Sequence, residues 1–211
     1  MILPLRALAS KYSLSPLTRI LHVGGHYGEE CEEYFREGAE RVTFFEPSAV
    51  SYNEMVRRIG HKENVRCVCC ALGAYEGEAT LYVETANAGQ SSSLLRAKVH
   101  AAQYPQITFD ATERVVLHTL DYMTALDGVG WNLIAIDVQG YELEVFKGAE
   151  ETLKSVQAIS AEINREELYE GCALVGEVDA WLGVRGFDRV ETEWCGGTWG
   201  EGIYVRRGAA P

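Results

Sequence analysis

Short apolar runs alternate along this chain with segments whose apolar side chains recur every three or four positions. The runs predict strands, and the wider spacing predicts helices. Strands are predicted at 19–23, 42–45, 64–71, 78–84, 114–120, 131–138, 156–163, 187–194 and 202–206. Helices are predicted at 3–12, 28–36, 48–60, 140–146 and 174–184.

Strands that alternate with helices are typical of an α/β fold, in which helices cover both faces of a mostly parallel sheet. Only residues 195–199 separate the last two strands, which predicts a hairpin and an antiparallel edge strand. No repeat or linker divides the sequence, so we expect one domain over 1–211, with 1–18 as a helical extension. Ligands of such folds bind beyond the carboxyl ends of the strands.

The composition excludes several classes of protein. The chain has 211 residues, of which 47% are hydrophobic and 24% charged, so it can bury one core. No apolar run approaches the ~18 residues of a membrane span. A net charge of −12 repels nucleic acid and anionic membrane surfaces, so we expect neither as a partner. The oligomeric state is left open.

The six cysteines predict a reducing compartment. Cys67, Cys69 and Cys70 fall in the strand predicted at 64–71, which we expect to be buried. No cysteine spacing matches a zinc site, so free thiols are expected, as is usual in the cytosol. The first residues lack the long apolar segment of a secretion signal, and we expect a cytoplasmic location.

A glycine turn joins the strand at 19–23 to the next helix. Gly24, Gly25 and Gly28 surround His26, and glycines there allow a ligand to approach the backbone closely. Glu46 ends the next strand, where an acid can accept both hydroxyls of a ribose. Because His26 takes the place of the second glycine of GxGxxG, a nicotinamide cofactor is disfavoured. The unit predicts an adenosine-cofactor site, and the alternative is a plain turn beside a surface glutamate.

A second group of acids lies near the middle of the chain. Asp137 ends an apolar strand, so its carboxylate is expected at the mouth of a pocket. A desolvated carboxylate there can act as a base, hold a cation or orient a substrate hydroxyl. Alternatively, Asp137 caps the following helix. Glu142 falls in the first turn of that helix, where the helix dipole alone accounts for an acid.

In this order and spacing, these features resemble the FkbM-type S-adenosylmethionine-dependent methyltransferases. The resemblance runs from about residue 20 to 206 and is strongest at 136–149, where the sequence reads IDVQGYELEVFKGA. Further matching stretches are 22–28, 44–47, 71–77, 91–94 and 120–121.

The resemblance implies a class I methyltransferase fold, which is Rossmann-like and has a seven-stranded sheet with helices on both faces. It implies S-adenosylmethionine as the cofactor, with its ribose on Glu46 and its adenine near Ala71. The implied cofactor-binding residues are His22, Gly24, Gly25, His26, Gly28, Glu46, Ala71 and Asp137. His22 and His26 replace the Asp and Asn that are usual in the family. A charged His22 would repel the cationic groups of the cofactor.

The resemblance also implies O-methylation, usually of a sugar or natural-product hydroxyl. Such a hydroxyl needs a base to remove its proton. Asp137 is the first candidate for this base, Glu162 the second, and His118 the third. We expect no metal, although a divalent cation between Asp137, Glu162 and the substrate would do the same work.

Loop 85–97 is the predicted lid over the substrate. The candidate substrate-binding residues are Gln90, Ser92, Glu142 and Trp199. The alternative is an ordinary flexible loop, with the tryptophan packed in the core.

Two other functions compete with this one. A catalytically weak or inactive relative, acting as a binding or interaction protein, would suit His22 and His26. A nucleic-acid base methyltransferase is disfavoured by the charge. It would also require Asn/Asp-Pro-Pro-Tyr/Phe after the central strand, where residues 137–140 read DVQG.

Overall fold

The structure, a computed structural model, describes residues 4–125 and 128–208. The outermost parts of the domain predicted at 1–211, which are 1–3 and 209–211, lie outside the described residues. Within the described ranges, no helix combines the length and the apolar character that a membrane crossing requires.

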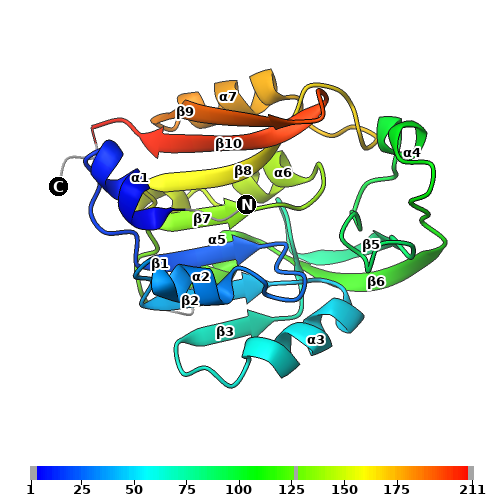
Figure 1. Cartoon of the computed structure of the whole chain (residues 1–211), viewed down its shortest axis with the longest axis horizontal. Coiled ribbons are helices and arrows are strands. Elements are labelled where there is room, and N and C mark those ends of the chain that lie inside the picture. Colours follow the sequence, from blue (N-terminus) through cyan, green and yellow to red (C-terminus); the bar gives the residue numbers. More distant parts are fainter. Residues whose placement is uncertain (1–3, 126–127, 209–211) are drawn as a thin grey trace.

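Seven strands form the main sheet, in the order β3-β2-β1-β7-β8-β10-β9 (Figure 1). Their bounds are β1 Arg19–Val23, β2 Arg41–Phe45, β3 Val65–Val68, β7 Leu133–Ile136, β8 Ala158–Asn164, β9 Phe187–Cys195 and β10 Trp199–Arg206. The first five strands in this order pair in parallel, and β10 runs antiparallel to both of its neighbours. The mostly parallel seven-stranded sheet is therefore confirmed, and its antiparallel strand lies one place inside the edge.

Helices cover both faces of this sheet, as predicted. They are α1 Leu5–Lys11, α2 Cys31–Arg36, α3 Ala49–Ile59, α5 Leu120–Ala125, α6 Glu142–Lys147 and α7 Val175–Gly183, with a 3-10 turn at Thr152–Lys154. Alternation along β1 separates two cores: Ile20 packs with α1, α2 and α3, whereas Leu21 packs with α5, α6 and α7. We call the first side the α1–α3 face.

Helix α1 ties the start of the described chain to its last strands. Leu5 and Leu8 are buried in the same core as Ile203 and Val205 of β10. At its end, Lys11 and Tyr12 bond to Glu191 of β9, with Nζ and Oη 2.9 and 2.8 Å from Oε1. The predicted helical extension is thus packed into the domain.

A second, three-stranded sheet was not predicted. Its strands β4 Ala71–Leu72, β5 Gly77–Val83 and β6 Ala111–His118 lie in the order β4-β6-β5. The strands predicted at 78–84 and 114–120 belong to this sheet rather than to the main one. An apolar run reports that a strand is buried but not which sheet buries it, so the sequence could not separate the two sheets.

The prediction of one buried strand at 64–71 is wrong. β3 ends at Val68, Cys69 is exposed, and the chain then enters the second sheet at Ala71. β3 is the edge strand, paired only with β2, and its residues are half-buried. The prediction of free thiols is confirmed for all six cysteines.

Two helices begin later than predicted, because residues with positive φ precede them. Gly28 has φ 73°, and α2 begins only at Cys31. Gln139 and Gly140 have φ 54° and 96°, and α6 begins at Glu142. Helices α4 Val99–Gln103 and α5 were not predicted, since both are short and α5 directly follows β6.

Candidate active site

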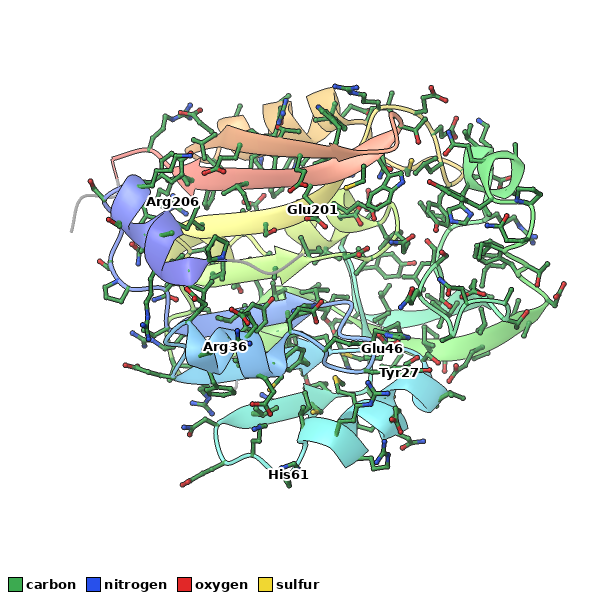
Figure 2. The ribbon with its side chains drawn as sticks, in the orientation of Figure 1. Tyr27, Arg36, Glu46, His61, Glu201 and Arg206 are labelled. Carbon is green, nitrogen blue, oxygen red and sulfur yellow. The ribbon has the colours of Figure 1, made fainter. Side chains whose placement is uncertain are left out.

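One large cavity, of about 600 Å³, lies at the carboxyl ends of β1, β2, β7 and β8. This is the end of a parallel sheet at which ligands bind, beside the strand where the order reverses. Loop 85–93 and residues that follow α4 close its outer side. Glu46 at the end of β2 and Glu201 on β10 belong to opposite sides of the cavity (Figure 2).

The glycine turn after β1 is required by the packing of the chain itself. Gly24 has φ +86°, and a Cβ built there would lie 1.8 Å from the carbonyl oxygen of Asp137. Its N–H and that of Gly25 both donate to the carbonyl of Phe45. A Cβ at Gly28 would lie 2.4 Å from Ile59, and Gly28 does not line the cavity. The turn therefore has room for backbone alone.

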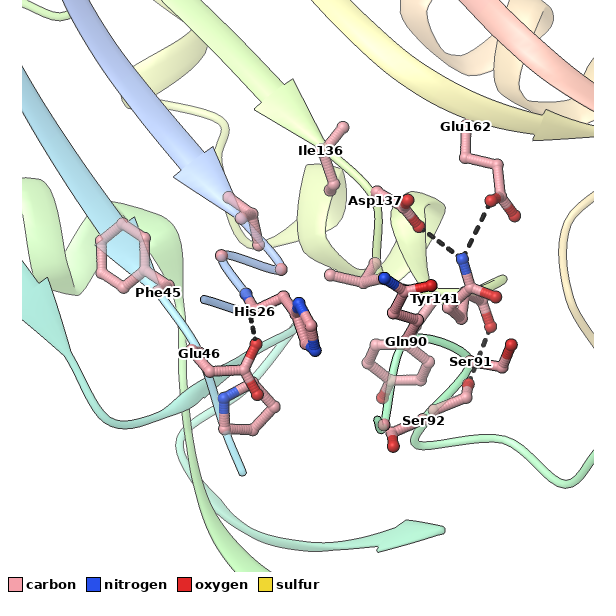
Figure 3. A pocket seen from close by; sticks show the side chains of 18 of the residues that line it. His26, Phe45, Glu46, Gln90, Ser91, Ser92, Ile136, Asp137, Tyr141 and Glu162 are labelled. Carbon is pink, nitrogen blue, oxygen red and sulfur yellow. Dashed lines mark hydrogen bonds between the residues drawn. The ribbon is translucent and has the colours of Figure 1, made fainter. Parts of the chain in front are cut away.

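Glu46 is buried at the end of β2, with its carboxylate beside the glycine turn (Figure 3). Oε2 accepts the N–H of His26 at 2.9 Å, and Oε1 accepts the N–H of Ser48 at 2.8 Å. Burial raises the pKa of Glu46 to about 7, against the opposing effect of these two N–H groups. Each oxygen retains lone pairs for a further donor.

The imidazole of His26 links this turn to loop 85–97. Nδ1 lies 2.9 Å from Oε1 of Glu29, and Nε2 lies 2.9 Å from the carbonyl oxygen of Ala88. A carboxylate and a carbonyl only accept, so both ring nitrogens must donate and the ring is an imidazolium. Burial lowers the pKa of His26, but the bonds to Glu29 and Ala88 outweigh it and the net pKa is raised.

His22 is buried in β1, where its Nδ1 lies 2.8 Å from the hydroxyl of Tyr34. Its ring packs against Phe44, with the ring centroids 5.0 Å apart. Burial lowers the pKa of His22, so the side chain is neutral at physiological pH. A neutral imidazole does not repel a cationic ligand.

A row of polar side chains crosses four neighbouring strands at this end of the sheet: His22, Asp137, Glu162 and Glu201. Asp137 follows β7 directly, and Glu201 of β10 pairs in register with Glu162 of β8. Alternation places all four on the α1–α3 face, because Ala135, Ala158 and Ile203 of the same strands pack there. We call Asp137, Glu162 and Glu201 the acid row.

The acid row has raised pKa values. The carboxylate of Asp137 is open to the cavity, yet protein surrounds that cavity, and the loss of bulk water raises its pKa. Burial, followed by the charges of Asp137 and Glu142, raises the pKa of Glu162 well above its usual range. Burial and Asp137 raise that of Glu201 to about 7. Carboxyl groups with raised pKa values in a cleft are typical of sites of acid–base chemistry.

Gln139, which the sequence analysis did not select, lies within the acid row. Its Nε2 donates to Oδ1 of Asp137 at 2.6 Å and to Oε2 of Glu162 at 3.0 Å (Figure 3). The hydroxyl of Tyr169 lies 2.6 Å from its Oε1. Glu201 was also missed, although it is an acid at a position of β10 that alternates with core residues.

Glu142 is buried beneath the row and does not line the cavity. Its Oε1 accepts the N–H groups of Val138 and Gly140, at 3.0 and 3.1 Å. Glu142 thus closes the turn before α6. The alternative that Asp137 caps this helix is wrong, because the N-cap residue is Tyr141.

Asp137, Glu142 and Glu162 each bring a carboxylate oxygen within 4.8 Å of the others, a spacing that could hold a metal ion. The donors already present do not suit a cation there. The amide N–H groups of Gln139 point at two of these carboxylates, and Glu142 is bonded to backbone N–H groups. We therefore propose no metal at this cluster.

The remaining predicted residues divide into two groups. Those that line the cavity are Ala71, Gln90, Ser92 and Trp199. Trp199 donates from Nε1 to the hydroxyl of Tyr104, at 3.2 Å. His118 does not line the cavity; it bonds to Glu76 and stacks on Tyr122.

The end of the cavity near Trp199 is partly aromatic. Four more residues line this end of the cavity: His100 on α4, Tyr104 directly after that helix, Ile107 and Leu168. His100 is buried, and its Nδ1 has no hydrogen-bond partner among the described residues. No sequence signal predicts these contacts, because the segment 99–107 has neither strand nor long-helix periodicity.

The family model described as "Methyltransferase FkbM domain" matches residues 22–189. The curated 2-O-methyltransferase NoeI of Sinorhizobium fredii is 26% identical over 159 residues, which is 72% of this chain and 65% of NoeI. The match thus spans somewhat less than two thirds of that relative.

Solved structures share the fold at low identity. TrmK of M. capricolum, in complex with S-adenosyl-homocysteine, superimposes with a TM-score of 0.55 at 7% identity, over 100% of this chain and 71% of TrmK. The magnesium protoporphyrin IX methyltransferase ChlM from Synechocystis PCC 6803, with bound SAM, gives 0.52 at 10% identity, over 96% and 76%. The expected class I methyltransferase fold is therefore confirmed.

Proposed function

The chain belongs to the FkbM methyltransferase family, and from that premise we propose that it methylates a hydroxyl of a sugar, glycan or small natural product with S-adenosylmethionine. One observation carries the proposal. A single cavity joins a buried carboxylate beside a glycine turn to a row of acids on the neighbouring strands. The name of NoeI, a 2-O-methyltransferase, supports oxygen as the methylated atom.

The proposed cofactor fits the glycine-turn side of the cavity. Glu46 has free lone pairs for two ribose hydroxyls, and Gly24 and Gly25 line the cavity beside it. Ala71 lines the same side, next to the expected place of the adenine. A volume of about 600 Å³ is within the range of pockets that hold ligands of this size.

S-adenosylmethionine, when bound, supplies a methyl group already activated on a cationic sulfur. The chain must then bring a hydroxyl within about 3 Å, in line with that methyl, and exclude water. Asp137 is the proposed base for the hydroxyl proton, with Glu162 as the second candidate, since both line the cavity with raised pKa values. His22 and His26 contribute their hydrogen bonds to the shape of the site.

The acceptor is proposed to lie between the acid row and loop 85–97. Trp199 and Tyr104 offer aromatic surface to a sugar ring, and Gln90 and Ser92 offer hydrogen bonds. Loop 85–97 is the proposed lid, since Ser92 and Ser93 line the cavity from it. His118 and Glu142 do not line the cavity, so we assign them no contact with substrate.

Calorimetric titration with S-adenosylmethionine and S-adenosylhomocysteine tests the cofactor. We expect both to bind, and Glu46→Gln to weaken binding by ~1–3 kcal/mol through lost charged hydrogen bonds. Because the pKa of Glu46 is about 7, wild-type affinity should rise from pH 6 to pH 8 more than that of the variant. Absence of binding at millimolar ligand would remove the proposal.

Glu113→Gln is the matched control. Oε1 of Glu113 also accepts a backbone N–H, from Ala49 at 3.1 Å, but Glu113 does not line the cavity. Its affinity should equal that of the wild type. An equal loss in both variants would mean that the ribose is held elsewhere.

Asp137→Asn tests the base. Methyl transfer to a panel of glycosides should fall by at least ~100-fold, because general-base catalysis contributes that much or more. Cofactor binding should persist in the variant. Full turnover would exclude Asp137 as the base, whereas binding without turnover in the wild type would identify the inactive, ligand-binding relative.

A further inference from the structure

Gln139 bridges two members of the acid row, and the proposed methyl transfer assigns it no role. Its Nε2 lies 2.6 Å from Oδ1 of Asp137 and 3.0 Å from Oε2 of Glu162. An ionised Asp137 only accepts, and it makes the shorter of the two contacts, so the nitrogen of the amide, and not its oxygen, must face the acids. One NH₂ group thus donates to two acids that would otherwise face each other without a donor.

The amide is held from behind by a buried residue. Tyr169 has 0% of its surface exposed, and its hydroxyl donates to Oε1 of Gln139 across 2.6 Å. This contact agrees with the amide orientation that points the NH₂ group at the acids. The same hydroxyl lies 3.1 Å from the carbonyl of Ser91, in the proposed lid.

The backbone of Gln139 is also constrained. Its φ of 54° lies in the left-handed region, which is strained for a non-glycine residue and persists only where the surroundings require it. Its carbonyl accepts the hydroxyl of Ser93 at 2.7 Å. Both main chain and side chain of Gln139 are therefore fixed, and both fixing contacts lead to the lid.

We propose that Gln139 is a positioning residue, which holds Asp137 and Glu162 in one arrangement and allows Asp137 to remain ionised as the base. The catalytic part of this inference rests on the proposed function. Without the two N–H groups, repulsion between the carboxylates would leave one of them protonated. With one additional proton bound to this pair of carboxylates, the acid row would lack its base.

The other titratable groups around the pair do not replace Gln139. They are His22 from β1, Glu142 from α6, Glu201 from β10 and Tyr169 from the segment after β8. Burial keeps His22 neutral, and the other three are acids or a phenol. None of these four brings a positive charge to the pair.

Carboxyl titration followed by NMR tests the inference without any substrate. In Gln139→Leu, the higher apparent pKa of the Asp137–Glu162 pair should rise by ~1 unit or more relative to wild type. Gln139→Glu keeps the shape of the side chain and adds a third carboxylate, so its shift should be larger. Tyr169→Phe keeps the NH₂ group of Gln139 but removes the hydroxyl that holds the amide, so the pKa shift should be smaller. Identical titration curves in wild type and in both folded Gln139 variants would overturn the proposal.

Turnover provides the second readout. Gln139→Leu should lower kcat at least ~10-fold and move the acid limb of the pH profile upward, with affinity for S-adenosylhomocysteine within ~3-fold of wild type. Gln157→Leu is the control, because its amide oxygen accepts the N–H of Ser15 at the opposite end of the sheet. Its kcat and pH profile should match the wild type. A wild type without turnover would refute the proposed function alone, since the titration still decides the role of Gln139.

Discussion

The two sides of the cavity are built on different principles. On the glycine-turn side, backbone geometry defines the shape: Gly24 leaves no room for a Cβ, and Glu46 is held by two backbone N–H groups. On the other side, the acid row brings three side chains of like charge together, and Gln139 provides the donor between two of them.

The two sides of the cavity differ in the substitutions and the changes of pH that they tolerate. The shape of a backbone turn does not depend on pH, but the turn fails when a methyl group is added at Gly24. A site made of crowded carboxylates accepts shape-conserving substitutions, but its charge state depends on every neighbour. Substitutions should therefore affect mainly folding on the first side and mainly protonation on the second.

The largest expected effect is that of Gly24→Ala. Its Cβ would overlap the carbonyl of Asp137 in a backbone conformation with φ +86°, so we expect a loss of more than ~3 kcal/mol in the free energy of unfolding, measured in urea. Gly176→Ala in α7 is the control, because a Cβ there meets open space. It should be neutral or stabilising by up to ~1 kcal/mol. Equal losses in both would refute the backbone account of the turn.

An intermediate effect, dependent on pH, is expected for Glu201→Gln. The pKa of Glu201 is raised to about 7 in the folded chain, so between its unfolded value and 7 the native state binds more protons than the unfolded state. Wild-type stability therefore falls over this range as pH rises, and the variant lacks that loss. Between pH 5 and pH 8 the variant should gain ~1–2 kcal/mol relative to wild type, measured by thermal or urea unfolding.

Glu193→Gln serves as its control. Glu193 pairs with Glu201 across β9 and β10, but its side chain is exposed. The substitution should change stability little at either pH. A gain for Glu201→Gln that did not depend on pH would show that the acid row is not under electrostatic strain.

The smallest effect is expected for His26→Gln, which removes the imidazolium between Glu29 and Ala88. Proteolysis within loop 85–93 should become roughly 2–5-fold faster, because an accessible ionic contact contributes less than ~1 kcal/mol. The pKa of His26 is raised in the folded chain, so its contribution is complete below pH ~6.5 and lost as pH rises through the folded value. The ratio of variant to wild-type cleavage rates should therefore approach one at high pH. A ratio independent of pH would exclude the imidazolium as the link.

The sequence was most informative where function and local pattern coincide. The strand at 19–23, the turn after it and Glu46 follow each other closely in the chain, so one stretch of sequence predicts one side of the cavity. The placement of Asp137 also followed from its position at a strand end, whereas Glu162 was implied by the family resemblance. These residues do line the same cavity.

The missed residues depend on contacts between distant segments. Glu201 belongs to the acid row because β10 pairs with β8 in the register that places Glu201 opposite Glu162. Gln139 contacts two acids because a left-handed turn directs its amide toward them, and Tyr169 holds that amide from the other side. Periodicity reports burial along one strand, but pairing register and turn geometry are properties of the folded chain.

The tie between α1 and the last two strands has a consequence for synthesis. A nascent chain emerges from the ribosome with α1 ahead of β10, so Leu5 and Leu8 are synthesised long before their core partners on β10. The acid row likewise lacks Glu201 until β10 has emerged. Domains complete their folding only when all their strands are available, so this site forms only after β10 has left the exit tunnel.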